Sequence, residues 1–236
     1  MSVVFDLSIF PEDLQKRIDK MLTFTPTKNK SFNKSFSFEA SLEPVKCYYT
    51  ENKKVYLPYR FACTLLNKFF NMEKFPPISP DKSLEFKGKL LSRQEEPYEQ
   101  ALEHLKRYNT TTIALYPGFG KTFLGCMLSH RLNRITCVLV HRENVGKQWI
   151  KSFKSYIPDI KDEDLWYVND KVKPNAKIMI CMAGRTDKIP EKLRKSVGTL
   201  IIDEAHCFCS ASRIKPLLSF SPRFTIVETA TPIKDN

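Results

Sequence analysis

Apolar residues recur at helical spacing near the start of the chain. Residues 11–22 begin with a proline and two acids, which suit a first helical turn, and one face of the predicted helix carries Leu14, Ile18, Met21 and Leu22. A second helix is predicted over residues 58–71. Between them, residues 36–38 and 48–56 alternate like half-buried strands. These elements predict a small α+β accessory domain over residues 1–80.

The pattern changes after a proline-rich stretch at residues 75–80, which cannot continue a helix and predicts a linker. Over residues 81–236, strands that are apolar throughout alternate with amphipathic helices. The predicted strands are 112–116, 135–141, 165–168, 177–182, 199–203 and 223–228, and the predicted helices are 97–106, 122–133, 143–156, 191–196 and 211–220. Buried strands joined by crossover helices predict an α/β fold. Its parallel sheet has helices on both faces, and its ligands bind at the carboxyl ends of the strands.

The net charge of +12 indicates a polyanionic partner, and nucleic acid is the usual one. Residues 1–90 hold 15 basic and 10 acidic residues, which gives +5, and the remaining residues hold 23 and 16, which gives +7. The excess is therefore spread over the folded surface. No apolar run is long enough to cross a bilayer and no secretion signal is visible, so a soluble intracellular protein is expected. The seven cysteines are expected to be buried free thiols.

A phosphate-binding loop is predicted at residues 115–122, Leu-Tyr-Pro-Gly-Phe-Gly-Lys-Thr, between a strand and a helix. Gly118 and Gly120 let backbone N–H groups turn around a phosphate. Lys121 would reach the β- and γ-phosphates, and the Thr122 hydroxyl would bind Mg²⁺. The first position of the general pattern is leucine instead of glycine. The alternative is an ordinary helix start that follows a strand.

Two neighbouring carboxylates follow the apolar strand at residues 199–203. Nucleotide hydrolysis needs one carboxylate to hold Mg²⁺ and another to accept a proton from the attacking water. Asp203 fits the first role and Glu204 fits the second. The alternative is that the pair caps the next helix. The phosphate loop on the same predicted sheet favours the catalytic interpretation.

Together these motifs resemble those of superfamily 2 helicases of the DEAH type. The resemblance covers residues 86–236, and its motifs are Gly-Phe-Gly-Lys-Thr122, the strand and helix from Cys137 to Gln-Trp149, Asp203-Glu-Ala-His206 and Thr229-Ala-Thr-Pro232. The amino-acid sequence of these motifs is most similar to that of the transcription-associated helicases of large cytoplasmic DNA viruses. It is also similar to the translocase subunit of transcription factor IIH and to the UvsW and RecG motors. The resemblance implies a RecA-like fold.

The resemblance also implies a role for each matching residue. The catalytic group would be Lys121, Asp203, Glu204 and His206. ATP would be held by Gln94, Pro117, Gly118, Phe119, Gly120, Lys121 and Thr122, with Gln94 reading adenine and Gln100 as the fallback. Mg²⁺ would be held by Thr122 and, partly through water, by Asp203. Coupling to nucleic acid would fall to His141, Arg142, Thr229, Ala230 and Thr231. Arg142 could instead be a solvated residue at a helix start.

The function expected on this basis is that of an ATP-dependent helicase or translocase, with DNA favoured over RNA. Transcription machinery is an expected partner, and the host cytoplasm is the expected location if the protein is viral. A second RecA-like domain, with its arginine finger, is expected in a longer protein, so residues 1–236 alone should hydrolyse ATP weakly or not at all. The alternatives are an RNA helicase, a non-catalytic interaction module and, less favoured, a small-molecule kinase.

The accessory domain carries basic residues interspersed with aromatic ones. Lys28, Lys30 and Lys34 alternate with Phe32 and Phe36, as a surface that stacks bases and binds phosphates would. The alternative, which we favour, places the phenylalanines on the core face of a strand. Because related motors often grip duplex DNA with an extra leading domain, duplex binding is the hypothesis for residues 1–80.

Overall fold

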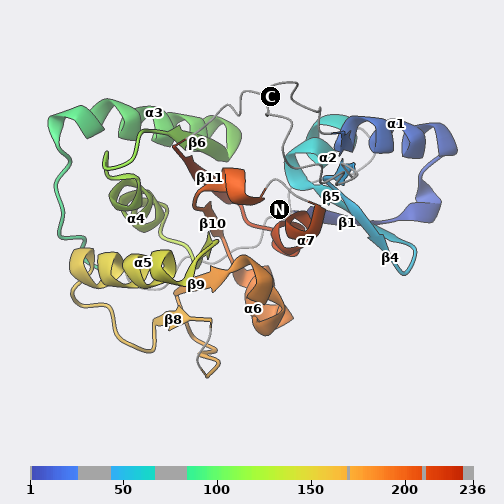
Figure 1. The fold of residues 1–236 in the computed structure, drawn as a ribbon. Coiled ribbons are helices and arrows are strands. Elements are labelled where there is room, and N and C mark those ends of the chain that lie inside the picture. Colours follow the sequence, from blue (N-terminus) through green and yellow to red (C-terminus); the bar gives the residue numbers. More distant parts are fainter. Residues whose placement is uncertain (1, 26–43, 67–83, 169–170, 209–210, 231–236) are drawn as a thin grey trace, which may run out of the picture.

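Six parallel strands form the larger sheet of the protein (Figure 1). The structure, a computed structural model, describes residues 2–25, 44–66, 84–168, 171–208 and 211–230. The sheet order is β6-β11-β10-β7-β9-β8, and each neighbouring pair is parallel. Its strands are β6 (Thr110–Ala114), β7 (Thr136–Val140), β8 (Leu165–Tyr167), β9 (Ile178–Met182), β10 (Thr199–Ile202) and β11 (Phe224–Thr229). The predicted α/β fold is confirmed.

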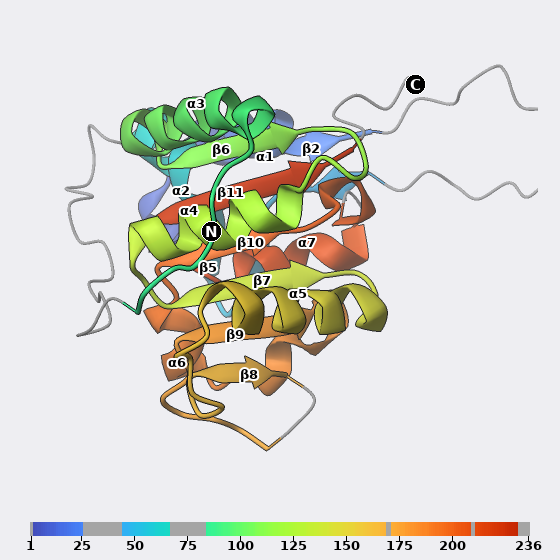
Figure 2. The same ribbon diagram turned by 90° about the vertical axis from the view of Figure 1, so that its left-hand side faces the viewer.

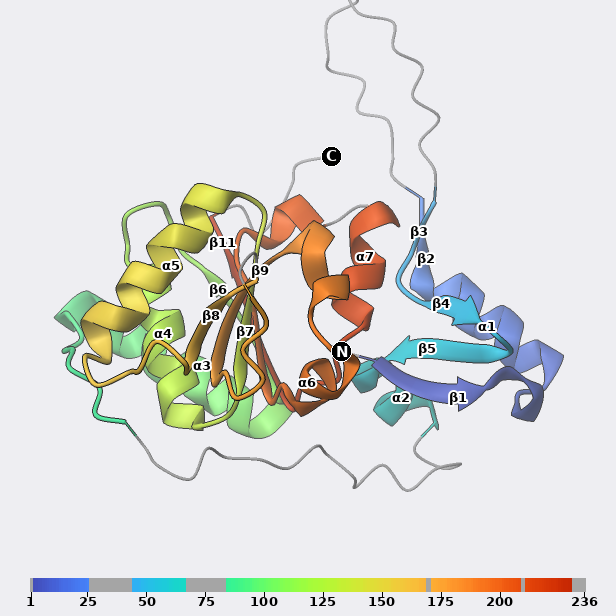
Figure 3. The ribbon, with the colours of Figure 1, turned by 90° about the horizontal axis from the view of Figure 1, so that it is seen from below.

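Helices cover this sheet on both faces, as Figure 3 shows. One face carries α3 (Ser92–Tyr108), α4 (Lys121–Leu132) and α5 (Glu143–Tyr156), which Figure 2 views from the front. The other face carries α6 (Glu191–Ser196) and α7 (Ala211–Leu218). Each face has its own apolar core, and both β7 and β10 are buried along their whole length. Burial on both faces explains why these strands have no polar alternation.

A smaller antiparallel sheet lies beside α7, in the order β1-β5-β4 (Figure 3). Its strands are β1 (Ser2–Asp6), β4 (Tyr49–Glu51) and β5 (Lys54–Pro58). The helices α1 (Glu12–Leu22) and α2 (Tyr59–Leu66) pack on it, and β2 (Thr23–Phe24) pairs with β3 (Val45–Lys46). The strand-like pattern predicted at residues 48–56 corresponds to two paired strands, β4 and β5, which are joined by Asn52 and Lys53 in left-handed conformations. Short 3₁₀ helices complete the elements: η1 (Leu7–Ile9), η2 (Ala183–Lys188) and η3 (Ala205–Phe208).

Several predicted boundaries are wrong for identifiable reasons. The first strand of the large sheet ends at Ala114 instead of residue 116, because the chain turns into a loop at Leu115. Helix α3 begins at Ser92, before Pro97, because the side chain of Gln94 caps its first turn. Met21 was expected on the buried face of α1 but is 48% exposed. Strand β1 was not predicted at all.

Some predictions lie outside the described residues: the proline-rich linker, the strand at residues 36–38 and the lysines at 28, 30 and 34. The end of the second predicted helix, beyond Leu66, also lies outside them. Within the described ranges, none of the helices is both long enough and apolar enough to cross a membrane.

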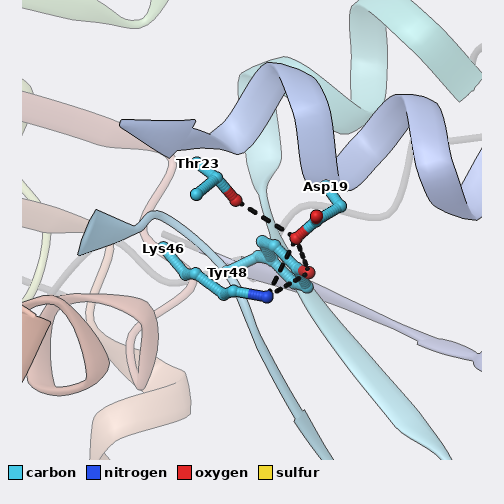
Figure 4. A network of polar contacts seen from close by, with 4 residues as sticks. All are labelled: Asp19, Thr23, Lys46 and Tyr48. Atoms are coloured by element: carbon cyan, nitrogen blue, oxygen red, sulfur yellow. Dashed lines mark hydrogen bonds and ion pairs between the residues drawn. The ribbon is translucent and has the colours of Figure 1, made fainter. Parts of the chain in front are cut away.

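A polar network ties α1 to β2, to β3 and to the segment that follows β3 (Figure 4). Asp19 Oδ1 accepts hydrogen bonds from Tyr48 Oη at 2.6 Å, Lys46 Nζ at 3.0 Å and Thr23 Oγ1 at 3.1 Å. These donors, Tyr48 first, lower the pKa of Asp19 from its ordinary 3.8 to about 2. Two of the partners come from the chain beyond residue 43, so the network joins segments that are distant in sequence.

Protonation of Asp19 should weaken this connection. A lowered pKa means that the network contributes its full stability above the ordinary pKa, and that this contribution is lost as the pH falls through about 2. We expect Asp19→Asn to unfold at a lower urea concentration than the parent chain at about pH 6, and the deficit to shrink toward about pH 2. Asp13→Asn, at an exposed position on the same helix, is the control. A deficit that does not change with pH would contradict the prediction.

Candidate nucleotide-binding site

The loop between β6 and α4 has the backbone of a phosphate cradle. Gly118 has a φ of 81° and Gly120 a φ of 104°, values that residues with a Cβ atom rarely adopt. Lys121, the first residue of α4, folds back so that its Nζ donates to the carbonyl oxygen of Leu115 at 2.9 Å. Pro117 is exposed on the loop. The amino terminus of α4 therefore opens onto a turn of backbone N–H groups, an arrangement suited to anions.

Gln94 lies directly against this loop and is 4% exposed. Its Nε2 donates to the carbonyl oxygen of Phe119 at 2.9 Å, and its Oε1 accepts from the backbone N–H of Leu91 at 3.0 Å. In this arrangement the amide of Gln94 braces the loop, and its role as adenine reader stays a prediction. The fallback, Gln100, is exposed on α3, where it donates to Glu96 at 3.1 Å.

The two predicted carboxylates follow β10, which lies two strands from β6 in the sheet. Asp203 is 6% exposed, and its Oδ2 accepts a hydrogen bond from Trp149 Nε1 at 2.7 Å. Burial raises the pKa of Asp203, whereas the hydrogen bond from Trp149 and the charge of Lys121 act in the opposite sense. Because β6, β11 and β10 pair in parallel, the loop after β6 and the carboxylate after β10 emerge at one edge of the sheet.

His206 stands between the carboxylates and the end of β11. Its Nδ1 lies 3.3 Å from Thr229 Oγ1, a hydrogen bond, and 3.3 Å from Glu204 Oε2. Glu204 itself has a φ of 50°, an unusual conformation for this residue type. Ala230 continues from Thr229 and is partly buried, whereas Thr231 lies outside the described residues. The structure thus brings Glu204, His206 and Thr229 together.

The two residues after β7 lie at the same edge. His141 is close enough to Asp203 and Glu204 for both carboxylates to act on its pKa. Burial is the largest effect, however, and it lowers the pKa of His141. Arg142 is exposed at the start of α5. Thr122 follows Lys121 in the first turn of α4 and is partly buried.

Sequence reasoning missed two residues beside this edge. Trp149 was noted only as part of a motif, and its contact with Asp203 was not predicted. Glu228, in β11, has no exposed surface, and neither carboxylate oxygen has a hydrogen-bond partner within the part of the chain that the structure describes. Burial and the nearby Asp203 raise the pKa of Glu228 well above its ordinary value. One signal was available, since Glu228 is an acid inside an otherwise apolar strand.

Comparison with known proteins identifies the family. The sequence pattern of the family "Type III restriction enzyme, res subunit" matches residues 87–234, which include the phosphate loop, both carboxylates and Thr229. The chain belongs to this family. The match confirms that the larger unit is the RecA-like domain of a superfamily 2 helicase. ATP binding, typically with Mg²⁺, is implied for members of the family.

A curated relative of this res-subunit family member is "Putative helicase 161L" of Invertebrate iridescent virus 6. The two are 26% identical over 197 residues, which are 78% of this chain and 42% of the relative. The chain therefore spans less than half of that relative's length. The similarity agrees with the viral helicases that the motifs resemble.

Solved structures show the same fold. The UvsW helicase from Bacteriophage T4 is 14% identical, with a TM-score of 0.57 over 94% of this chain and 86% of that chain. The Sulfolobus solfataricus SWI2/SNF2 ATPase core, solved in complex with dsDNA, is 16% identical. Its TM-score is 0.53, over 66% of this chain and 35% of that chain. At such low identity these similarities establish the fold of the res-subunit family member and nothing finer.

The contact between Gln94 and the loop can be tested with two alanine substitutions. A Cβ atom at Gly120 would lie 2.5 Å from Gln94 Nε2, whereas one at Gly118 would have no atom within 4 Å. Both substitutions force alanine into a left-handed backbone, at a cost of about 1–2 kcal/mol. We expect Gly120→Ala to weaken binding of a fluorescent ATP analogue about tenfold more than Gly118→Ala, because it also displaces Gln94. Equal losses would show that the contact is unimportant.

Proposed function

We propose that this protein is the ATP-binding half of an ATP-dependent nucleic-acid motor. The observation that carries the proposal is the convergence of the phosphate loop and Asp203–Glu204 at the carboxyl edge of one sheet. Parallel pairing brings the ends of β6, β11 and β10 to that edge, and His206 contacts both Glu204 and Thr229. Ligands of open parallel sheets bind at this edge. Membership of the helicase family points to the same chemistry.

The residues present fit a magnesium–ATP complex. Buried Asp203 offers a carboxylate, Thr122 a hydroxyl in the first turn of α4, and the glycines of the loop offer backbone N–H groups. Mg²⁺, when bound with ATP, supplies positive charge against the phosphates. Lys121 would exchange the carbonyl of Leu115 for phosphate oxygens. Glu204 would orient the attacking water and accept its proton, as a general base must.

The contact between His206 and Thr229 gives the site a connection to the rest of a motor. The same atom of His206, Nδ1, contacts both Glu204 and Thr229 at the end of β11, so a shift at Glu204 can reach Thr229. Arg142, exposed beyond the same edge, is suited to a phosphate of the nucleic-acid strand. A second RecA-like domain, which we propose for a longer protein, would complete the site and move relative to this one.

DNA is the favoured nucleic acid. The SWI2/SNF2 core that shares the fold was solved with dsDNA, and the net charge of +12 suits a polyanion. We propose that the unit built from β1, β4 and β5 contacts duplex ahead of the motor, and that the motor serves transcription, replication or repair. RNA is the alternative substrate, because none of the motifs distinguishes the two.

A non-catalytic interaction module is the alternative from another class. In it, the nucleotide would only stabilise a surface that recruits other proteins. The positioned Glu204 and its contact with His206 favour catalysis, since binding alone would not need them.

Substitution of Glu204 separates these functions. We expect Glu204→Gln in the full-length protein to lower the kcat of ATP hydrolysis by at least about a hundredfold while ATP affinity stays near the parent value, because only the base is removed. Glu103→Gln, an exposed position on α3, is the matched control. Wild-type biological activity of Glu204→Gln, despite lost hydrolysis, would favour the interaction module.

The nucleic-acid substrate can be found by stimulation of hydrolysis. We expect duplex DNA to raise the ATPase rate of the full-length protein more than single strands or RNA do. Residues 1–236 alone should show little turnover, because the arginine finger expected from a second domain is needed to stabilise the transferring phosphoryl group. Strong turnover by residues 1–236, or stimulation by RNA alone, would contradict these expectations.

A further inference from the structure

Trp149 holds the carboxylate that is assigned to the metal. It lies on α5 with no exposed surface and packs against Phe153, with ring centroids 5.8 Å apart. Its Nε1 donates to Asp203 Oδ2 at 2.7 Å, well within the range of a strong hydrogen bond. An indole N–H can only donate. Trp149 can therefore fix the orientation of Asp203 without competing with it for a cation.

The indole is itself held by an unusual packing arrangement. A Cβ atom at Gly125, in α4, would lie 2.4 Å from Glu228 Oε1 and 2.7 Å from the Cη2 atom of Trp149. The indole of Trp149 and the carboxylate of Glu228 thus both lie against the backbone of α4 at Gly125, in space that the side chain of any other residue would occupy. Glycine inside a helix costs about 1 kcal/mol relative to alanine, so its presence here needs a packing reason.

Glu228 reaches this place from the sheet. Strands β10 and β11 pair in parallel with Ile202 opposite Val227, so the next positions along, Asp203 and Glu228, are neighbours. Both lie on the face beneath α4 and α5, because side chains alternate along a strand and Ile201 and Ile226 belong to that core. The metal-holding acid, the tryptophan and the buried acid therefore form one cluster beneath the phosphate loop.

We propose that Trp149 is a positioning residue for Asp203, and that Gly125 and Glu228 fix the indole from behind. This inference rests on the proposed function, since it assigns Asp203 to Mg²⁺. Groups that orient a metal ligand from the second layer set metal affinity, and their loss typically costs about 10- to 100-fold. A merely structural tryptophan would change stability and leave the metal dependence unaltered.

The test compares two Trp→Phe substitutions in the 236-residue chain. Trp149→Phe keeps the aromatic ring and removes the N–H donor. Trp166→Phe is the matched control, because Trp166 is 1% exposed in the core of the opposite face and its Nε1 has no partner among the described residues. Calorimetry would measure binding of a non-hydrolysable ATP analogue, first in EDTA and then at fixed analogue over a Mg²⁺ titration.

We expect Trp149→Phe to raise the half-saturating Mg²⁺ concentration at least about tenfold, with metal-free binding of the analogue unchanged. Trp166→Phe should have the same half-saturating Mg²⁺ concentration as the parent chain. Glu228→Gln should raise that concentration less than Trp149→Phe does, because the indole keeps its N–H donor and loses only part of its packing support. An unchanged Mg²⁺ dependence in Trp149→Phe, with the analogue still bound, overturns this inference and leaves the proposed function standing. Failure of the parent chain to bind the analogue overturns both.

A second measurement does not depend on the folding of Trp149→Phe. The chain has two tryptophans, so in Trp166→Phe the emission comes from Trp149 alone. Adding Mg²⁺ with the analogue should shift the emission wavelength of Trp149, because the indole N–H donates to Asp203, the carboxylate assigned to the metal. The same addition to the Trp166→Phe, Asp203→Asn double variant should give no shift. If the emission of Trp149 stays the same when Mg²⁺ is added in the presence of bound analogue, the inference is overturned.

Discussion

Parallel pairing of β6, β11 and β10 is the constraint on which the site depends. Because all three strands run in one direction, the residues that follow each of them emerge at the same edge of the sheet. The phosphate loop follows β6, the carboxylates follow β10, and Thr229 ends β11 between them. The pairing of the strands thus brings Lys121 and Asp203, which are 82 positions apart in the sequence, to one edge of the sheet. The side chains then add only local adjustments, such as the contact of His206 with Thr229.

The same convergence makes the site electrostatically unfavourable when nothing positive is bound. Asp203 and Glu228 are buried side by side with Glu204 nearby, and Lys121 is the one cation whose charge lowers the pKa of both buried acids within the described ranges. An acid whose pKa is raised by folding reduces stability as the pH rises through that pKa, which is the reverse of the effect at Asp19. Burial thus makes ionisation of both acids costly, and a bound cation would offset this cost. Strain of this kind is common at functional sites.

How far the sequence predicts the structure depends on which interactions place each residue. Every strand of the large sheet was predicted, because burial on both faces leaves an unbroken apolar run. Strand β1 was missed because its partner, β5, lies some 50 residues away and its own pattern is short. The start of α3 was missed because a side-chain cap does not appear in hydrophobic periodicity. Asp203 could be predicted from its position in a motif. Its hydrogen bond with Trp149 could not, because the two residues are 54 positions apart and meet only in the tertiary fold.

The leucine at the first position of the phosphate loop shows why one departure from a motif can be harmless. Glycine is required where the backbone is left-handed, and in this loop that holds at Gly118 and Gly120. Leu115 has no positive φ, so a side chain is tolerated there, and it packs against the core beneath α3 and α4. The backbone of Leu115 makes the hydrogen bonds at this position. Its N–H donates to the carbonyl oxygen of Thr229 at 3.2 Å, and its carbonyl oxygen accepts from Lys121 Nζ. The loop is thereby tied both to the end of β11 and to its own lysine. A residue of a motif can therefore be substituted wherever only its main-chain atoms take part in the interactions of the site.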